Sequence, residues 1–203
     1  MQKNAAAFQP VRPVTLAGRH VRLEPLTLSH LDALAAVAYD ASLWRWTNDR
    51  VVDRASLALY VHEALAAQER GGALPFATVL IDGDRVVGST RFLNIVPRDS
   101  RVEIGATWIA APFQRSPVNT EAKLLMLRHA FDTLGAVRVE LKTHSLNEKS
   151  RAAIERIGAR FEGIHRKHML MPDGTRRDTA WYSILDDEWP AVKADLEYRM
   201  EER

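Results

Sequence analysis

The sequence predicts a single mixed α/β (α+β) domain. The length of 203 residues fits one domain with a sizeable core. Runs of β-branched residues separated by Asp-Gly and Pro-Asp-Gly turn signals predict hairpins, and the second half alternates between strand and helix patterns. No linker, repeat or low-complexity segment divides the chain. We therefore expect a flexible N-terminal arm over residues 1–13 and one domain over residues 14–203.

The first part of this domain is predicted to place two amphipathic helices before the main strands. Residues 14–26 indicate a short strand pair around Gly18. Ser29 is a suitable N-cap for a helix whose apolar residues share one face, namely Leu31, Leu34, Ala35 and Ala38. A second helix keeps this spacing from Leu57 to Leu65, and Gly71 and Gly72 end it.

A three-stranded meander follows. Residues 75–93 predict a hairpin around Asp82 and Gly83, a pair that tolerates the positive φ of a tight turn. Residues 101–109 alternate as a third strand. One face is predicted to carry Val102, Ile104, Ala106 and Trp108, and the other Glu103, Gly105, Thr107 and Ile109.

The second half predicts strand and helix in alternation. Pro117 suits the first turn of a buried helix that runs to Leu134. Residues 137–143 alternate as a strand, and Asn147 leads a short helix that ends at Gly158. A long hairpin turns at residues 172–174, and a last helix begins after Asp186.

Composition excludes several classes of protein. Apolar residues make up 46% and charged residues 27%, as in ordinary soluble globules. The absence of cysteine excludes disulfides, thiolate metal sites and a thiol nucleophile. A net charge of +2 is too small to argue for nucleic acid, although the many arginines suit a small anionic ligand. Without a signal-like or membrane-spanning apolar run, we expect a cytoplasmic protein with no membrane partner.

Few motifs point to chemistry directly. The glycine-rich nucleotide motifs, the H-E-x-x-H zinc motif and the G-x-S-x-G motif are all absent. His165 and His168, three apart on a predicted strand, are expected on opposite faces, so we expect no metal there. Trp44 and Trp46 either close over the core or line a substrate mouth.

Two segments carry a resemblance to a known family. EIGATWIAAPFQRSPVNTEAKLLML (residues 103–127) and VELKTHSLNEKSRAAIERIGARFEG (residues 139–163) resemble the GNAT superfamily of acetyl-CoA-dependent N-acyltransferases, in particular its RimJ/RimL-type branch of ribosomal-protein N-terminal acetyltransferases. The likeness extends from Val14 to the final helix. It implies a central mixed, mostly antiparallel sheet flanked by helices, and acetyl-CoA as co-substrate without a metal.

The resemblance also implies a coenzyme site. In the family a Q/R-x-x-G-x-G/A signature opens the central helix, whose backbone N–H groups hold the pyrophosphate. The signature maps onto residues 114–119 but departs at both glycine positions, where Pro117 and Asn119 stand. Pro117 removes one donor or is simply a helix starter. The implied coenzyme-binding residues are Trp108, Ile109, Ala110, Gln114, Arg115, Ser116, Val118, Asn119, Thr120, Asn147 and Ser150.

Two residues are implied to be catalytic. Glu103 resembles the family's meander-strand glutamate, which accepts the amine proton directly or through water; alternatively it is a surface strand residue. Ser150 lies near the thioester sulfur in the family pattern and could protonate the thiolate, because Ile154 stands where many relatives have a tyrosine. Asn147 and Ser150 also suit a helix cap and first turn.

The function predicted from these residues is acetyl transfer from acetyl-CoA to a primary amine in a ternary complex, since no cysteine can carry the acyl group. The acceptor is a protein N-terminus or a small amine. N-terminal amines need less proton removal than lysine, because their pKa is about 7.7–8.0 against about 10.4. A non-catalytic acyl-CoA-binding module is the alternative, and a homodimer stays open.

Overall fold

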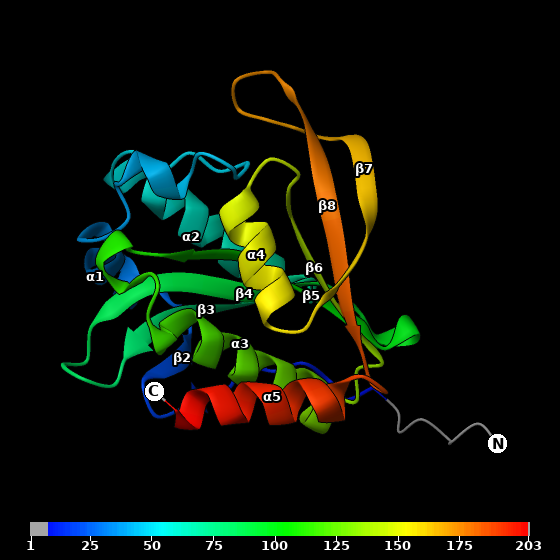
Figure 1. Ribbon diagram of the computed structural model, residues 1–203. Helices are drawn as coiled ribbons and strands as arrows, with labels where there is room; N and C mark the ends of the chain where they lie inside the picture. The colour runs from blue at the N-terminus through cyan, green and yellow to red at the C-terminus, as the bar shows by residue number, and fades with distance from the viewer. Residues whose placement is uncertain (1–7, 203) are drawn as a thin grey trace.

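The fold is built on an eight-stranded sheet with the order β1-β2-β3-β4-β5-β6-β8-β7 (Figure 1). The computed structural model describes residues 8–202. Its strands are β1 (Leu16–Ala17), β2 (Val21–Pro25), β3 (Leu74–Leu80), β4 (Val86–Val96), β5 (Arg101–Ile109), β6 (Arg138–His144), β7 (Arg160–Leu170) and β8 (Arg176–Leu185). All neighbours pair antiparallel except β5 and β6, which are parallel. The expected mixed, mostly antiparallel sheet is confirmed.

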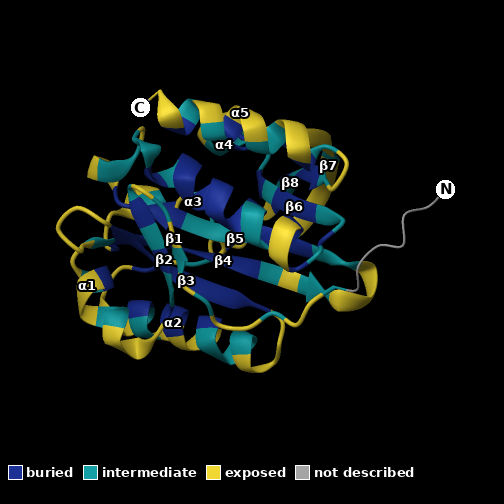
Figure 2. Ribbon diagram, turned by 90° about the horizontal axis from the view of Figure 1, so that it is seen from below, coloured by how far each residue is buried: buried dark blue, intermediate teal, exposed yellow. Residues whose placement is uncertain are grey.

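Helices cover both faces of this sheet (Figure 2). One face carries α1 (Leu31–Ala35) and α2 (Arg54–Glu69), and the other carries α3 (Pro117–Arg128), α4 (Glu148–Arg156) and α5 (Trp189–Glu201). The larger core lies under α3, α4 and α5, and a smaller one lies under α2. None of the described helices is long and apolar enough to cross a bilayer.

The first helix differs from the prediction at its start. A 3-10 turn over Leu28–His30 precedes α1, and Thr27 stands before it in extended backbone. Ser29 therefore lies inside the turn and does not cap the helix. The cause is a local polar network, in which Thr27 Oγ1 lies 2.7 Å from Ser29 Oγ and 2.9 Å from His30 Nδ1.

A β-bulge corrects the predicted alternation in β5. Ala106 has a φ of 46°, and the register against β4 shifts at this point. The extra residue reverses the alternation, so Val102 and Ile104 face the larger core while Trp108 packs in the smaller core under α2. The predicted shared face of Trp108 and Ile104 is therefore wrong.

A second irregularity corrects the predicted placement of the two histidines. Lys167 has a φ of 50°, and the β7–β8 register shifts between His165 and Met169. His165 and His168 consequently lie together against Trp181, with their ring centroids 5.5 Å apart. Within residues 8–202 no group of three or more metal-ligating side chains is found.

The predicted N-terminal arm is described only in part, since residues 1–7 lie outside the described residues. Phe8 and Val11 pack against the larger core, and Gln9 N donates to Leu134 O at 2.8 Å. The end of the predicted arm therefore contacts the helical layer.

One buried carboxylate joins α3 to the start of the sheet. Glu121 accepts backbone N–H groups from Arg19, His20 and Val21 at 2.7–2.8 Å, so its two oxygens satisfy a whole turn. Gly18 makes room for this group, because a Cβ there would lie 2.4 Å from the Glu121 Cδ. The β1–β2 turn and α3 thus depend on one side chain.

We expect Glu121→Gln to destabilise the fold, because the amide nitrogen must face a backbone N–H group in place of an oxygen. Hydrogen bonds to charged groups contribute about 1.5–3 kcal/mol each. A loss of about 2–4 kcal/mol lowers Tm by roughly 5–15 °C in a chain of this size. Thermal melts measure it, with exposed Glu69→Gln on α2 as the control. Equal melting of both variants would contradict the role of Glu121.

Candidate active site

The centre of the candidate site is the point where β5 and β6 separate. Their parallel ladder holds only three pairs, Arg101–Arg138, Val102–Val139 and Glu103–Glu140. Beyond it β5 pairs with β4 alone, and β6 pairs with β8 alone. The bulge at Ala106 bends β5 at this point. We call the divergence of residues 104–109 from residues 141–144 the strand fork.

Glu103 lies at the closed end of the strand fork. Its side chain is 1% exposed, and Oε2 accepts hydrogen bonds from Asn94 Nδ2 at 2.7 Å and Lys142 Nζ at 2.9 Å. Oε1 lies over Gly105, where a Cβ would approach it to 3.0 Å. The interpretation of Glu103 as a surface residue is therefore wrong, because the face opposite Val102 is covered here.

The open end of the strand fork faces the N-terminus of α3. Ser116 is the N-cap, and its Oγ donates to Phe113 O at 2.6 Å and accepts weakly from Val118 N at 3.4 Å. Pro117 occupies the first helical turn, as predicted. The N–H groups of residues 118–120 point out of the helix end, where an anion is favoured.

Two side chains at this helix end stand out. Asn119 Oδ1 is buried and has no hydrogen-bond partner within the described residues. Arg115 is exposed with a φ of 59°, which turns the chain into the helix. The Thr120 side chain is buried. The outward N–H groups and an exposed cation beside a helix N-terminus suit a phosphate-bearing ligand, whereas Asn119 Oδ1, an acceptor, would need a donor.

Gln114 bridges the open end of the strand fork. Its Nε2 donates to Ile109 O at 2.7 Å, and its Oε1 accepts from Lys149 Nζ on α4. Ala110 N donates to Val87 O at 2.8 Å, and Trp108 pairs with Ser89. The predicted binding residues 108–110 therefore line β5 at the strand fork, while Ile109 O and Ala110 N are engaged within the protein.

The other side of the open end is the start of α4. Asn147 is the N-cap, and its Oδ1 accepts from Ser150 N at 3.1 Å. Ser150 is half-buried, and Ile154 is buried in the larger core. The predicted cap and first turn are confirmed, and their position beside the strand fork keeps the functional interpretation open.

The face of the sheet that bears Glu103 is polar beyond α2. His144 meets Trp46 edge to face with ring centroids 4.8 Å apart, whereas Trp44 is buried in the smaller core. Burial lowers the pKa of His144, and the Arg177 charge adds to this effect. Burial likewise lowers the pKa of His168, with a further contribution from Lys142. Both imidazoles are therefore neutral at pH 7.

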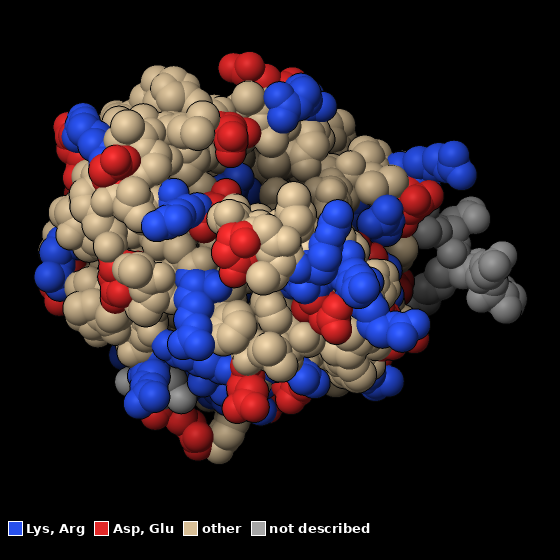
Figure 3. Space-filling model, turned by 90° about the horizontal axis from the view of Figure 1, so that it is seen from above, with Lys and Arg blue, Asp and Glu red and all other residues tan. Residues whose placement is uncertain are grey.

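A loop arches over this polar face. Asn48 Nδ2 donates to Leu170 O at 2.8 Å, and Arg177 Nη1 donates to Trp46 O at 3.2 Å. These bonds join the α1–α2 loop to the β7–β8 hairpin across β6. Figure 3 shows this side of the molecule hollowed near its centre, with basic atoms visible in the hollow.

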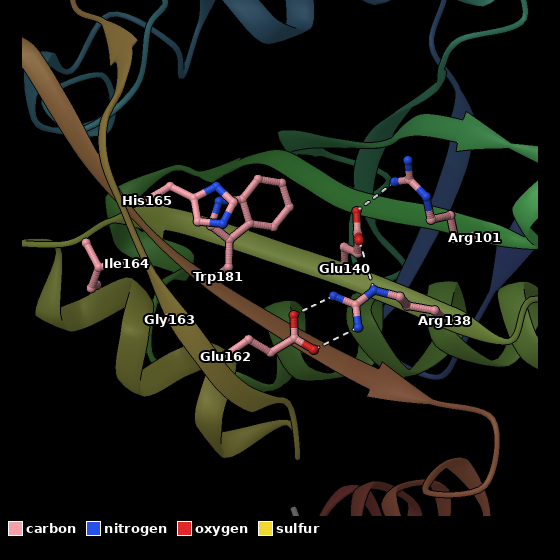
Figure 4. Close-up of a pocket in the computed structure, with 8 residues that line it drawn as sticks. All are labelled: Arg101, Arg138, Glu140, Glu162, Gly163, Ile164, His165 and Trp181. Carbon is pink, nitrogen blue, oxygen red and sulfur yellow. Dashed lines mark hydrogen bonds and ion pairs between the residues drawn. The ribbon is translucent and has the colours of Figure 1, made fainter.

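The outer part of the same face holds a shallow pocket of about 520 Å³. Its charged side chains are Arg101, Arg138, Glu140 and Glu162, and Figure 4 shows them joined by ion pairs. His165 and Trp181 form its other wall. This part of the face is electrostatically satisfied within the protein.

A buried lysine, absent from the residues predicted from the sequence, lies next to the strand fork. Lys123 on α3 donates to Thr107 Oγ1 at 2.7 Å and to Thr90 Oγ1 at 3.3 Å. Burial lowers its pKa to about 7. A lysine next to the apolar run of residues 124–127 in a helix expected to be buried was the available signal. Arg91, Lys142 and Arg177 were missed as well. They lie on strands whose side chains alternate between two faces, and the sequence alone does not tell which face is covered.

Comparison with known proteins gives a consistent picture. The family model described as "Acetyltransferase (GNAT) domain" matches residues 20–160. A Bacillus subtilis (strain 168) protein named "Putative ribosomal N-acetyltransferase YdaF" is 35% identical over 117 residues, which is 58% of this chain and 62% of that protein. The matched segment therefore spans less than two thirds of that relative.

Solved structures share the fold over nearly the whole chain. A GCN5-related N-acetyltransferase from Brucella melitensis is 35% identical with a TM-score of 0.88, covering 96% of this chain and 89% of that one. Mycobacterium smegmatis RimJ, in complex with CoA-disulfide, is 24% identical with a TM-score of 0.76, covering 88% of each chain. The second likeness concerns the fold alone.

We expect Lys123→Met to raise Tm at pH 6.5, because the protonated amine is costly to bury and Thr90 and Thr107 keep their mutual 2.8 Å contact. The pKa of Lys123 is about 7 in the folded chain against 10.5 for an ordinary lysine. The unfolded state therefore binds more protons above pH 7, and wild-type stability rises with pH.

The Tm advantage of Lys123→Met should accordingly narrow between pH 6.5 and pH 9.5. Paired melts at the two pH values measure it, and Lys149→Met on α4 is the control whose difference from wild type stays constant. An advantage independent of pH would show that Lys123 keeps an ordinary proton affinity.

Proposed function

Because the chain belongs to the GNAT acetyltransferase family, we propose that it transfers the acetyl group of acetyl-CoA to a primary amine by direct attack in a ternary complex. The observation that carries this proposal is the position of Glu103, a buried carboxylate at the closed end of the strand fork whose open end faces the α3 N-terminus. Both substrates can then meet in one place.

The residues around the strand fork fit the coenzyme. The backbone N–H groups of Val118, Asn119 and Thr120, with Arg115 beside them, would hold its pyrophosphate. The exposed Arg115 beside the helix N-terminus and the unpaired edge of β5 at residues 104–109 support this placement. The end of β5 with Ala110 after it and the Asn147–Ser150 turn would flank its pantetheine arm. When bound, the coenzyme supplies an activated acyl group as a thioester.

The Glu103 side chain would collect the proton of the incoming amine, directly or through water. Oε2 is held by Asn94 and Lys142, so Oε1 above Gly105 is the oxygen left to take part. Two donors on one oxygen fix the carboxylate in place, and such pre-positioning favours proton transfer. The chain has no cysteine to form an acyl-enzyme.

Ser150 would lie near the departing sulfur as proton donor or as anchor for a water molecule. It begins α4 with its N–H bound to Asn147, so its backbone is fixed beside the open end of the strand fork. Among the described residues its hydroxyl has no hydrogen-bond partner, and Ile154 is buried without a polar group. Ser150 is thus the polar group that α4 offers at this position.

The acceptor is the N-terminal amine of a protein. The relative whose name refers to ribosomal N-acetylation supports this choice. The lower pKa of an N-terminal amine supports it too, since Glu103 then has less proton removal to perform. A small amine is the alternative. Pro117 and Ile154 favour a non-catalytic acyl-CoA module as the rival.

We expect acetyl-CoA to stabilise the protein by about 2.7 kcal/mol at one hundred times its Kd, because the ligand binds only the folded chain. This corresponds to a rise in Tm of roughly 5–10 °C. Arg115→Glu should weaken binding about tenfold, and exposed Arg176→Glu on the distant hairpin should leave it unchanged. The absence of any shift at millimolar acetyl-CoA would refute the coenzyme assignment.

We expect Glu103→Gln to lower kcat/KM for an N-terminal peptide amine at least tenfold, since general base catalysis contributes about 10²–10⁴ in rate. The loss should shrink as pH rises, because more of the acceptor amine is then already neutral. Thiol release measured from pH 6 to pH 9 tests both statements.

The matched control is Glu140→Gln, which removes another buried carboxylate from the same sheet face one strand away. If both variants lose activity equally, the effect is one of folding or charge and the base lies elsewhere. If acetyl-CoA binds but neither the wild type nor any variant releases thiol, the result would favour the non-catalytic module.

A further inference from the structure

Two buried arginines lie on the face of the sheet that bears Glu103 and form no ion pair with a described carboxylate. Arg91 on β4 is 8% exposed, and Arg177 on β8 is 6% exposed. Within residues 8–202 neither forms an ion pair. Arg91 lies over the ring of Tyr60 at 4.6 Å, and Arg177 donates only to the neutral oxygens of Thr179, Trp46 and Asn48. Neither guanidinium group is in ion-pair contact with a carboxylate, although the charges of Arg91 and Asp49 and of Arg177 and Glu103 act on each other at longer range.

This arrangement contrasts with the outer part of the same face. Arg101 and Arg138 share the Glu140 carboxylate, and Arg138 also pairs with Glu162 (Figure 4). Those arginines are more exposed and still have partners. Burying a charge without a partner is costly, so a fold keeps such a group where a ligand supplies the opposite charge.

The unsatisfied atoms on this face show which chemistry is missing. Arg91 Nε and Trp181 Nε1 are buried and have no hydrogen-bond partner. Both atoms are donors, and a guanidinium has no acceptor atom. The Arg91 charge acts on the Asp49 carboxylate, but the two side chains form no ion pair within 4 Å. Burial raises the pKa of Asp49. A bound group that accepts hydrogen bonds and carries negative charge would satisfy these donors.

The two arginines flank the proposed acceptor position. Arg91 stands opposite Gly105 in the β4–β5 register, and Glu103 is the next residue of β5 on that face. On β8, Trp181 pairs with Lys142, and Thr179 and Arg177 follow at intervals of two on the same face. The strand order therefore places the Glu103–Lys142 pair between the two arginines.

We propose that Arg177 and Arg91 recognise a carboxylate that the acceptor carries close to its reacting amine, so that the enzyme prefers acidic acceptors. The proposal rests on the proposed function, in which the amine lies at Glu103. The acceptor's amine then lies at the Glu103 carboxylate, and the acceptor's own carboxylate lies at the guanidinium groups of Arg91 and Arg177. In a protein substrate the carboxylate belongs to an aspartate or glutamate that follows the first residue.

The test compares acceptors that differ only in this carboxylate. The peptide amides Ala-Asp-Ala-Ala-NH₂ and Ala-Asn-Ala-Ala-NH₂ have no free C-terminus, and glutamate and glutamine form the small-molecule pair. We expect kcat/KM at least about tenfold higher for the acidic peptide, because hydrogen bonds between charged groups contribute that much. A preference confined to free glutamate would assign the site to small amino acids and keep the carboxylate proposal.

Variants then connect the preference to the arginines. Arg177→Gln and Arg91→Gln should each reduce the ratio of acidic to neutral peptide towards 1, whereas Arg177→Lys should retain part of it. Arg176→Gln, the exposed neighbour on β8, is the control that keeps the ratio. A purely structural role would lower both rates together and leave the ratio intact, and this outcome would overturn the proposal.

A binding measurement separates this proposal from the proposed function. The N-acetylated forms of the two peptides are titrated calorimetrically into the protein with coenzyme A present. Tighter binding of the acidic peptide that is lost in Arg177→Gln supports the carboxylate site even if no peptide is acetylated, in which case only the proposed function fails. Equal binding and equal turnover of acidic and neutral peptides would refute the carboxylate site.

Discussion

The carboxylate of Glu121 is the contact on which the rest of the structure depends. One side chain in α3 satisfies three consecutive backbone N–H groups at the β1–β2 turn. Buried backbone donors need partners, and here a helix supplies them to a sheet edge. The contact fixes the position of α3, and with it the helix N-terminus at Ser116 and the buried amine of Lys123.

The bulge at Ala106 is the second constraint, because it turns a continuous sheet into one with a fork. Its positive φ adds a residue to β5, sends Trp108 to the opposite face and ends the ladder with β6 at Glu103. Strand irregularities of this kind are common beside active sites. The last ladder pair therefore places an acidic side chain where the two strand edges become available.

Buried charges without ion-pair partners lower the stability of the polar face beyond α2. Arg91 and Arg177 are buried there without an ion-paired carboxylate, a cost that an apolar residue of similar size would avoid, and Lys123 is a similar case on the α3 side of the sheet. Residues that serve folding alone are usually paired, as Arg138 is with Glu140 and Glu162. The cations without an ion-paired carboxylate gather around the strand fork, which is the region of the proposed site.

The sequence by itself determined the order of helices and strands, since hydrophobic period and turn residues such as Asp82 and Gly83 are local signals. It also placed Ser116, Asn147 and Glu103 on the elements that carry them. Only the tertiary structure decided that Trp108 leaves the face of Ile104, that His165 and His168 meet, and that Glu103 is buried. Bulges arise from packing between strands, and burial depends on which segments cover a face. Both are properties of contacts between residues far apart in the chain, which local periodicity does not contain.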